Sequence, residues 1–453
     1  MIFNDENFPP LPASWTTVRV DEACTLVTIR EKIKTKNYLN RGSLAVVDQG
    51  SALVGGYSND ASKVVETTLP VVVFGDHTRA LKFVDFPFAA GADGIKVLRP
   101  SASLHPRLVF RFLEAIKLPD RGYGRHFQHF RGSRIPVPPL DEQGRIADKL
   151  DAVLVRVDAC RDRLDCLPGI LKRFRQSVLA AATSGDLTVE WRANAASGSW
   201  SSRRLGELAI EVKNGLSPKP AEQPPGTPIL RINAVRPFFL RQDDLRFLQD
   251  SGNTSAYELR VDDLLFTRYS GSLEFVGICA RVRAINNPRL VYPDKLIRVR
   301  IDVDKALSSW IEIAVNAPAI REIIERTART SAGQTGISGK DLKELKVPIP
   351  SLREQAEIVR RVESLFAWAD RLEARLATAR ARVERLTPSL LAKAFRGELV
   401  PQDPADEPAS ELLKRLTQQP SANPNAPVKR QGSKPHHAKA SQAASNVREE
   451  SSS

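Results

Sequence analysis

The 453-residue sequence has little of what several protein classes need. Its four cysteines, Cys24, Cys160, Cys166 and Cys279, form no Cys-x-x-Cys pair. This argues against a zinc site or a disulfide framework and favours a reducing cytoplasm. No apolar run approaches the roughly 18 residues that a membrane span requires. The N-terminus, MIFNDENFPPLP, is acidic and carries prolines, so we expect no signal peptide. These features predict a cytoplasmic protein that does not use a membrane.

Catalytic signatures are also missing from the sequence. The nearest approach to a phosphate-binding loop, GQTGISGKD at 333–341, has the wrong residues at two required positions. Neither a Gly-x-Gly-x-x-Gly nor an Asn/Asp-Pro-Pro-Tyr/Phe sequence occurs, so no dinucleotide or adenine-methylating site is indicated. His77 has Asp76 beside it but no further ligand nearby, which favours a structural or DNA-contacting histidine. We therefore expect a non-catalytic chain with no metal or cofactor of its own.

What the sequence has is size, apolar content and positive charge. It contains 67 Lys and Arg against 53 Asp and Glu, a net charge of +14. Such an excess suits a polyanionic partner, and nucleic acid is the first candidate. The 42% of hydrophobic residues is enough to build cores, and the length predicts two or three domains.

One long segment occurs twice. Residues 135–187 align without a gap to 347–399, and 16 of the 53 aligned positions are identical. Apolar residues in both copies recur in steps of four and three, which is the spacing of a two-helix seam. In the first copy they are Ile146, Leu150, Val153, Val157, Cys160, Leu164, Leu167, Leu171, Phe174 and Val178. In the second they are Ile358, Val362, Leu365, Ala369, Leu372, Leu376, Ala379, Val383, Leu386 and Leu390.

The repeat predicts two long helices packed on each other. The span from Ile146 to Val178 corresponds to about 48 Å of straight helix. Proline-rich entries precede each helix, and Gly185 and Gly397 mark their ends. We expect a break or kink at Pro168, and we expect Cys160 to be buried in the seam.

A fainter repeat precedes each helix. SWTTVRVDEA begins at Ser14 and SWSSRRLGEL at Ser199, and each is followed by short β-rich runs, a helical run and a polar loop with glycines. The predicted organisation is two variable domains alternating with two constant helical segments and ending in a disordered tail. The boundaries are 1–134, 135–192, 193–346, 347–416 and 417–453.

The phrases PPLDEQGRIADKLD, FRQSVLAAATSGDLT, IPSLREQAEIV and LLAKAFRGELVPQDP, placed around two divergent domains, resemble specificity subunits of Type I restriction–modification systems. The resemblance covers about residues 14–416. It implies an α+β fold in which two globular α/β target-recognition domains are separated by two long antiparallel coiled-coil helices with pseudo-twofold symmetry. Each domain would read one half of a split double-stranded DNA site. Two copies of an adenine methyltransferase subunit and motor–nuclease subunits would bind, and they would carry S-adenosylmethionine, ATP and Mg.

Candidate DNA-contacting residues are the polar and basic side chains of the predicted loops, because Lys and Arg suit phosphates and amides or hydroxyls suit base edges. In the first domain they are Lys34, Lys36, Asn37, Tyr38, Gln49, His77, Thr78, Arg79, Tyr123, Arg125, His126 and Gln128. In the second they are Lys213, Lys219, Arg231, Asn233, Arg268, Tyr269, Ser270, Gln334, Ser338 and Lys340.

Partner docking is expected around Glu142, Gln143, Glu354 and Gln355, although helix capping explains these residues about as well. One alternative to a DNA reader is a coiled-coil adaptor whose variable domains bind proteins. It explains the seam but not the basic charge or the polar loops. A nuclease or methyltransferase that acts alone is a second alternative, and the missing motifs weigh against it.

Overall fold

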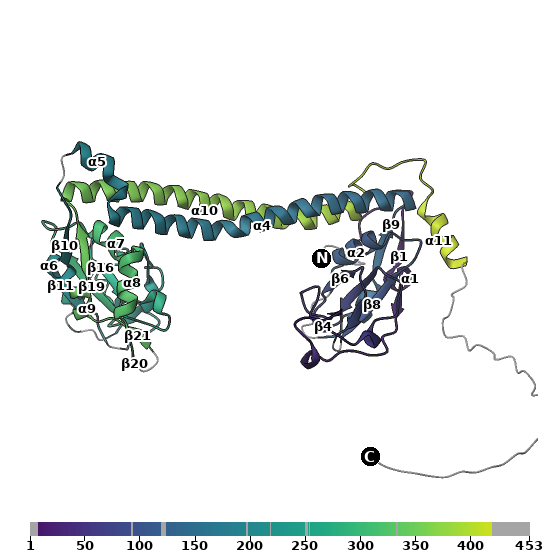
Figure 1. Cartoon of the computed structure of the whole chain (residues 1–453), viewed down its shortest axis with the longest axis horizontal. Helices are drawn as coiled ribbons and strands as arrows, with labels where there is room; N and C mark the ends of the chain where they lie inside the picture. The colour runs from purple at the N-terminus through teal and green to yellow at the C-terminus, as the bar shows by residue number, and fades with distance from the viewer. Residues whose placement is uncertain are drawn as a thin grey trace, which may run out of the picture. The chain divides into compact units, whose positions relative to one another are not determined.

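The computed structural model describes residues 8–91, 94–118, 124–195, 198–217, 219–249, 252, 254–331 and 334–418. The chain forms two compact units (Figure 1): residues up to Leu150 and from Leu390 make the first, and Asp151–Ser389 makes the second. Both long helices cross a unit boundary, so the domain boundaries expected from the repeat stay a prediction.

The first unit is built on a four-stranded antiparallel sheet in the order β2-β8-β5-β6. A smaller sheet, β4-β3-β7, contains one parallel pair, and β1 pairs with β9. The strands are β1 (Thr16–Arg19), β2 (Cys24–Val27), β3 (Leu44–Val47), β4 (Gly56–Ser58), β5 (Val71–Gly75), β6 (Leu81–Val84), β7 (Phe88–Ala90), β8 (Ile95–Pro100) and β9 (Arg134–Val137). The helices are α1 (Val20–Ala23), α2 (Pro106–Ala115) and α3 (Phe127–Gly132), with the short 3-10 turns η2 (Thr35–Asn37) and η3 (Ala61–Lys63).

The core of the first unit lies between its two sheets. All five residues of β5 are buried, because this strand is central in its sheet and has protein on both faces. Its side chains Val71 and Val73 pack in one cluster with Val47 and Phe88 of the smaller sheet. Helix α2, with Pro106 in its first turn, buries Phe112 and contributes a second apolar surface.

The second unit repeats this plan with a four-stranded antiparallel sheet in the order β11-β19-β16-β18. Its strands are β10 (Ser201–Arg204), β11 (Ala209–Asn214), β12 (Thr227–Leu230), β13 (Val235–Arg236), β14 (Phe239–Leu240), β15 (Leu245–Leu248), β16 (Leu264–Thr267), β17 (Tyr269–Ser270), β18 (Cys279–Arg281), β19 (Leu296–Ile301), β20 (Arg329–Ser331), β21 (Gln334–Gly336) and β22 (Lys346–Ile349). Its shorter helices are α5 (Val189–Asn194), α6 (Leu205–Leu208), α7 (Ser308–Asn316), α8 (Pro318–Thr327) and α9 (Gly339–Glu344), and its 3-10 turns are η4 (Asp186–Thr188), η5 (Ile232–Ala234), η6 (Ser255–Tyr257) and η7 (Leu273–Phe275).

Helix α7 occupies the centre of the second unit. Trp310 is fully buried, and its Nε1 donates to the carbonyl of Pro348 on β22 (3.0 Å). Strand β22 pairs with β10 just as β9 pairs with β1 in the first unit. The two units therefore share the short strand pair and the order of the main sheet, while their smaller sheets differ.

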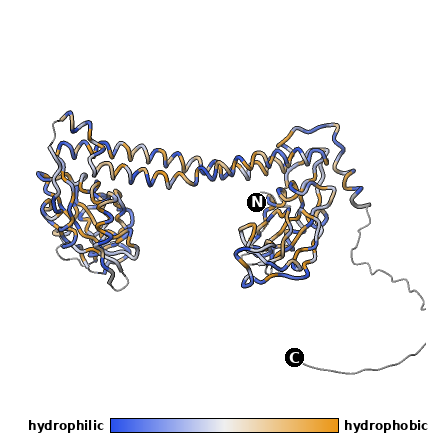
Figure 2. The backbone as a smooth tube through the Cα atoms, in the orientation of Figure 1, coloured by the Kyte–Doolittle hydropathy of each residue, from blue (hydrophilic) through white to orange (hydrophobic). Residues whose placement is uncertain are grey.

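The long helices are α4 (Leu140–Ser184) and α10 (Leu352–Phe395). Within the second unit they run antiparallel, because Arg175 Nη2 lies 2.6 Å from Asp370 Oδ1 while Arg380 Nη2 lies 2.6 Å from Asp165 Oδ1. Between these ion pairs lies an apolar seam. Its buried residues are Leu171, Ala369 and Leu376, and the partly buried Leu164, Phe174 and Leu372 pack against them. Figure 2 shows hydrophobic positions recurring along both helices. The α+β fold class, with two α/β domains and two long antiparallel helices, is confirmed.

Two details of the helices differ from expectation. We expected a break or kink at Pro168; helix α4 runs without interruption through this residue, so there is no break, and the kink stays a prediction. Seam contacts on both sides of this proline hold the helix, although the lost backbone bond costs about 3 kcal/mol. Cys160 is exposed rather than buried. A straight helix drifts about 20° per heptad from a 3.5-residue repeat, so a position counted along one continuous series can leave the seam.

Beyond α10, the first unit ends in α11 (Ala409–Gln418). The amide of Ala409 donates to the carbonyl of Ser14 (2.9 Å), which ties this segment to the start of β1. Across the described ranges, every helix is too short or too polar to cross a bilayer. The predicted disordered tail lies outside the described residues after position 418.

Candidate nucleic-acid interface

Several of the predicted contact residues lie around one repeated backbone arrangement. Strands β5 and β16 hold corresponding places in their sheets, and the residue that follows each strand makes the same two bonds. The amide of Asp76 donates to the carbonyl of Gly94 (2.6 Å), and the carbonyl of Asp76 accepts from His126 (3.0 Å). In the second unit the amide of Arg268 donates to Lys295 (2.8 Å), and its carbonyl accepts from Ile337 (2.9 Å). Each unit thus presents three loops at one end of its main sheet.

In the first unit this arrangement brings together Gln49, His77 and Thr78. Thr78 Oγ1 donates to the carbonyl of Gln49 (2.6 Å). The Oε1 atom of Gln49 is buried and has no hydrogen-bond partner among the described residues. Gly94 lies against these side chains with φ of +91°, and a Cβ there would be 2.8 Å from Gln49 Oε1 and 3.0 Å from His77 Cδ2. The glycine therefore leaves room for these two polar side chains, and the cluster of Gln49, His77 and Thr78 against Gly94 is called the polar niche below.

Two turns of the first unit carry other predicted contact residues. Lys34, Lys36 and Asn37 are exposed on or next to η2, which is anchored where the amide of Ile33 donates to Ala90 (2.8 Å). Arg79 closes the turn after β5 with a left-handed φ of 61°, which is uncommon for a residue with a Cβ.

A buried ion pair lies behind this niche. Lys82 on β6 is 5% exposed, and its Nζ is 3.4 Å from Asp48 Oδ1. Burial lowers the pKa of the Lys82 ammonium, and the Asp48 carboxylate partly offsets this effect.

Helix α3 corrects one prediction about the first unit. His126 is fully buried, and its carbonyl accepts from Phe130 (3.0 Å), so its side chain is not presented to DNA. Its neighbours Arg125 and Gln128 are exposed and stay candidates. Tyr38 is half-buried, with its ring against Gly56, so it packs within the domain as well as lying beside η2. Tyr123 lies outside the described residues.

In the second unit the strand end borders a hollow of about 230 Å³ that includes Asn233, Tyr269 and Ser270 among its lining residues. Tyr269 is flanked by two cations, since Arg268 Cζ lies 4.7 Å and Lys295 Nζ 4.9 Å from its ring centre. Lys295 was not among the predicted contact residues, because in the sequence a lysine before a strand looks like any other solvated lysine. Arg236, which also lines the hollow, was missed for the same reason.

Other predicted residues of the second unit have internal roles. Arg231 is ion-paired with Glu222 (2.8 Å) and Asp244 (2.6 Å). Ser338 caps α9 by accepting from the amide of Asp341 (3.2 Å), and its contact with DNA stays a prediction. Lys213 lies over the ring of Tyr257 at 4.3 Å and donates to Ala256.

The remaining predicted residues of the second unit are not among those that line the hollow. Lys219 and Lys340 are exposed, and Gln334 lies on β21. They stay predictions as phosphate or base contacts, because no bound DNA tests them.

The expected docking residues are buried at the starts of the long helices. Gln143 Oε1 accepts from the amide of His105 (2.7 Å), and its Nε2 donates to Pro138 (3.0 Å). Gln355 repeats both bonds with Leu307 (2.8 Å) and Pro350 (2.9 Å). At 1% exposure or less, neither amide can contact a partner, which corrects that prediction. Each glutamine instead fastens its long helix to the preceding domain.

The neighbouring glutamates are equally internal. Glu142 accepts from Trp15 Nε1 (2.9 Å) and Gln402 Nε2 (2.6 Å), and burial raises its pKa while these bonds oppose the rise. Glu354 accepts from Thr188 Oγ1 (2.8 Å) and Arg192 Nε (2.9 Å). The segment after one long helix therefore secures the start of the other helix within each unit. Direct docking by these two carboxylates is also corrected, since both are buried.

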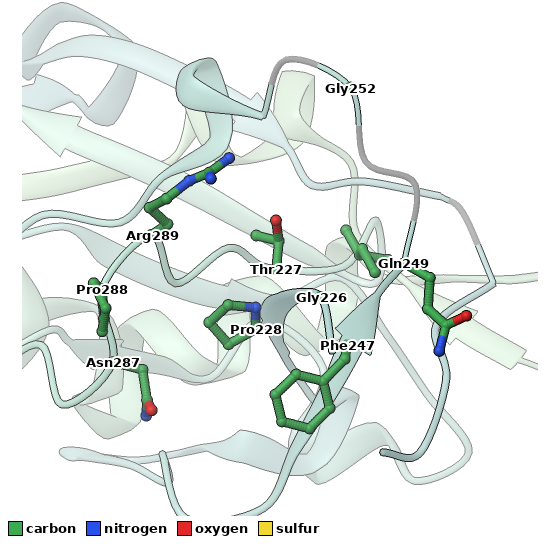
Figure 3. A pocket seen from close by; sticks show the side chains of 10 residues that line it. Gly226, Thr227, Pro228, Phe247, Gln249, Gly252, Asn287, Pro288 and Arg289 are labelled. Carbon is green, nitrogen blue, oxygen red and sulfur yellow. The ribbon is translucent and has the colours of Figure 1, made fainter. Parts of the chain in front are cut away.

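A larger hollow of about 670 Å³ lies at the end of the β12–β15 pair where Thr227 faces Leu248 (Figure 3). It is lined by Gly226, Pro228, Phe247 and Arg289, among others, and Arg289 Nε lies 3.5 Å from Glu258 Oε1. None of its lining side chains has a buried polar atom without a partner in the described chain. In the same ranges, no three His, Cys, Asp or Glu side chains are grouped to hold a metal ion.

The chain is similar in sequence to a known family model and to several named proteins. Residues 310–379 match the family model described as Type I restriction modification DNA specificity domain. The EcoKI specificity subunit of Escherichia coli K12 is 49% identical over 276 residues, which cover 60% of this chain and 59% of that relative. The StySPI specificity subunit of Salmonella potsdam is 32% identical over 434 residues, covering 88% of this chain and 92% of the relative.

Solved structures share the fold. A chain from work on complex assembly and conformational transition of the type I R-M system has a TM-score of 0.63 at 20% identity, covering 86% of this chain and all of that one. The HsdS subunit from Thermoanaerobacter tengcongensis has a TM-score of 0.51 at 20% identity, covering 87% and 99%. The resemblance seen in the sequence is thereby confirmed, and the chain belongs to the specificity subunits of Type I restriction enzymes.

Proposed function

We propose that this chain is the non-catalytic DNA reader of a Type I restriction–modification complex, with one half of a split, asymmetric site read by each domain. One observation carries the proposal. The same backbone arrangement follows β5 and β16, but it presents Asp76, His77 and Thr78 in one unit and Arg268, Tyr269 and Ser270 in the other. An identical scaffold with unlike side chains suits two unlike half-sites.

Within each half-site we assign two kinds of contact. The exposed cations Lys34, Lys36 and Arg125 of the first domain would bind phosphates and fix the register of the duplex. Gln49 of the first domain and Asn233 of the second would hydrogen-bond to base edges, since a side-chain amide matches adenine best. Net charge supports this division, because +14 favours association with a polyanion before any base is read.

We further propose that the chemistry resides in partner subunits. Two copies of an adenine methyltransferase subunit would bind the repeated constant surfaces, and motor–nuclease subunits would complete the restriction complex. These partners would supply S-adenosylmethionine, ATP and Mg in the cytoplasm. The adaptor alternative is not favoured, because the relatives are named as restriction-enzyme specificity subunits.

Gel-shift assays on interrupted duplexes, with the methyltransferase partner present, test the reader role. Gln49→Ala should reduce discrimination in one half-site only, and Asn233→Ala should do so in the other, each by about 10-fold or more per lost base contact. Ser62→Ala, in the exposed turn η3, is a matched control that should leave both half-sites unchanged. Methyl transfer by the purified chain alone would contradict the non-catalytic role.

A further inference from the structure

The 230 Å³ hollow of the second domain is lined by polar, charged and aromatic side chains. Six of its lining residues matter here: Asn233, Arg236, Thr267, Tyr269, Phe275 and Lys295. They come from η5, β13, the end of β16, β17, η7 and the residue before β19. Chain segments far apart in sequence therefore converge on one small volume.

One of the residues that line the hollow, Thr267, has an unpaired buried hydroxyl. Thr267 is 4% exposed, and its Oγ1 has no hydrogen-bond partner in the described part of the chain. The backbone of Thr267 is satisfied, since its amide donates to Ile278 (3.1 Å) and its carbonyl accepts from Gly277 (2.7 Å). Only the side chain is left without a partner, and a buried polar group in this state costs free energy until a ligand pairs with it.

Two aromatic side chains that line the hollow each have a cation near the ring. Tyr269 has Lys295 Nζ at 4.9 Å from its ring centre, and Phe275 has Arg236 Cζ at 5.0 Å. A flat ring can stack on such a side chain while an attached anion pairs with the neighbouring cation. That combination is the one that proteins use for unstacked nucleotides. At 230 Å³ the volume is below the usual range for drug-sized ligands, so it suits one base.

The corresponding place in the first domain is built differently. There the unpaired buried atom is Gln49 Oε1, and the residue equivalent to Lys295 is Gly94. The described aromatic–cation contacts of that domain include none with Gln49, His77 or Gly94. The first domain has an aromatic–cation pair near its strand end, Lys96 over Phe127 at 5.4 Å, but at Gly94 it has no side chain in the place of Lys295.

We propose that this hollow binds one nucleotide of the target whose base has left the duplex stack, with Thr267 Oγ1 bonded to the base edge. Tyr269 or Phe275 would stack on the base, and Lys295 and Arg236 would pair with the flanking phosphates. The proposal rests on the DNA-reading function proposed above. It predicts that an already unpaired base at one position of this half-site binds more tightly, because no pairing energy is spent on extrusion.

The test uses the full chain with its methyltransferase partner and interrupted duplexes carrying the matched site. Single mismatches are placed at each position of both half-sites, and the dissociation constant is measured for each duplex. At one position of the second domain's half-site, the mismatch should tighten binding about 5-fold or more. Thr267→Val and Tyr269→Ala should remove that gain and leave the effects of first-half mismatches unchanged.

Thr267→Val also separates this role from misfolding. Since it removes a buried hydroxyl without changing the shape, the free variant should melt at the same temperature as the parent or higher. If every mismatch weakens binding, or if the gain persists in both variants, the nucleotide site is wrong. Absence of binding to any matched duplex would instead overturn the proposed reading function.

Discussion

Lengthening the paired helices tests how the chain sets the gap between half-sites. The change inserts one heptad after Asp165 in α4 and one after Ala379 in α10. These two points are level, because Asp165 pairs with Arg380 and Arg175 pairs with Asp370 in the antiparallel register. A whole heptad keeps the apolar seam of Leu171 and its partners in phase.

The expected magnitude follows from helix geometry. Seven residues add about 10 Å of rise, and duplex DNA advances about 34 Å in 10 base pairs, so the unread gap should grow by about three base pairs. Both half-site sequences should stay unchanged, since neither reading loop is altered. Modified-base sequencing of cells that express the variant with its methyltransferase partner reads out both quantities.

A one-sided insertion is the control for this design. A heptad placed in α4 alone moves Arg175 and Asp370 out of level by about two helical turns, so we expect loss of methylation rather than a new gap. An unchanged gap in the doubly lengthened variant would refute the spacer role. Altered half-site letters with the same gap would refute it equally.

Three further predictions concern single residues. Gly94→Ala should abolish reading of the first half-site in gel shifts, because a Cβ at φ +91° meets Gln49 and His77, whereas Gly132→Ala has open space and should be silent. Gln355→Leu should lower the urea-unfolding free energy by about 2–4 kcal/mol, because the amide of Leu307 and the carbonyl of Pro350 lose their partner, and a loss below about 0.5 kcal/mol would contradict the fastening role. Glu357 accepts from Arg360 and Arg361, which lowers its pKa from 4.5 to about 2. Its stabilising effect should be complete above pH 4.5 and lost as the pH falls towards 2, and Glu357→Gln should remove that component of acid unfolding.

The helical framework could be predicted because its determinants are local. Steps of four and three between apolar residues specify a seam whatever the partner, and the duplicated register identified the partner as well. The predicted burial of Cys160 was wrong, because a spacing counted over ten positions does not follow the gradual drift of a straight helix away from the seam. Helix α4 has no break at Pro168, because packing in the seam offsets the tendency of proline to end a helix.

The reading loops were predicted less well because polar side chains gain their roles from tertiary neighbours. Ser338 and Arg231 have suitable chemistry, but a capping box and two carboxylates already occupy them. Thr267 and Lys295 were missed because a threonine ending a strand and a lysine preceding one are ordinary in any sheet. Only the fold shows that both line one hollow with Tyr269.

The central claim, that this chain reads a split DNA site, is tested most directly by modified-base sequencing of the host genome with the gene intact and deleted. The account predicts that N6-methyladenine disappears on deletion from one interrupted, asymmetric motif and from no other. A methylation pattern that is identical in the two strains, while the methyltransferase partner is expressed, would contradict it.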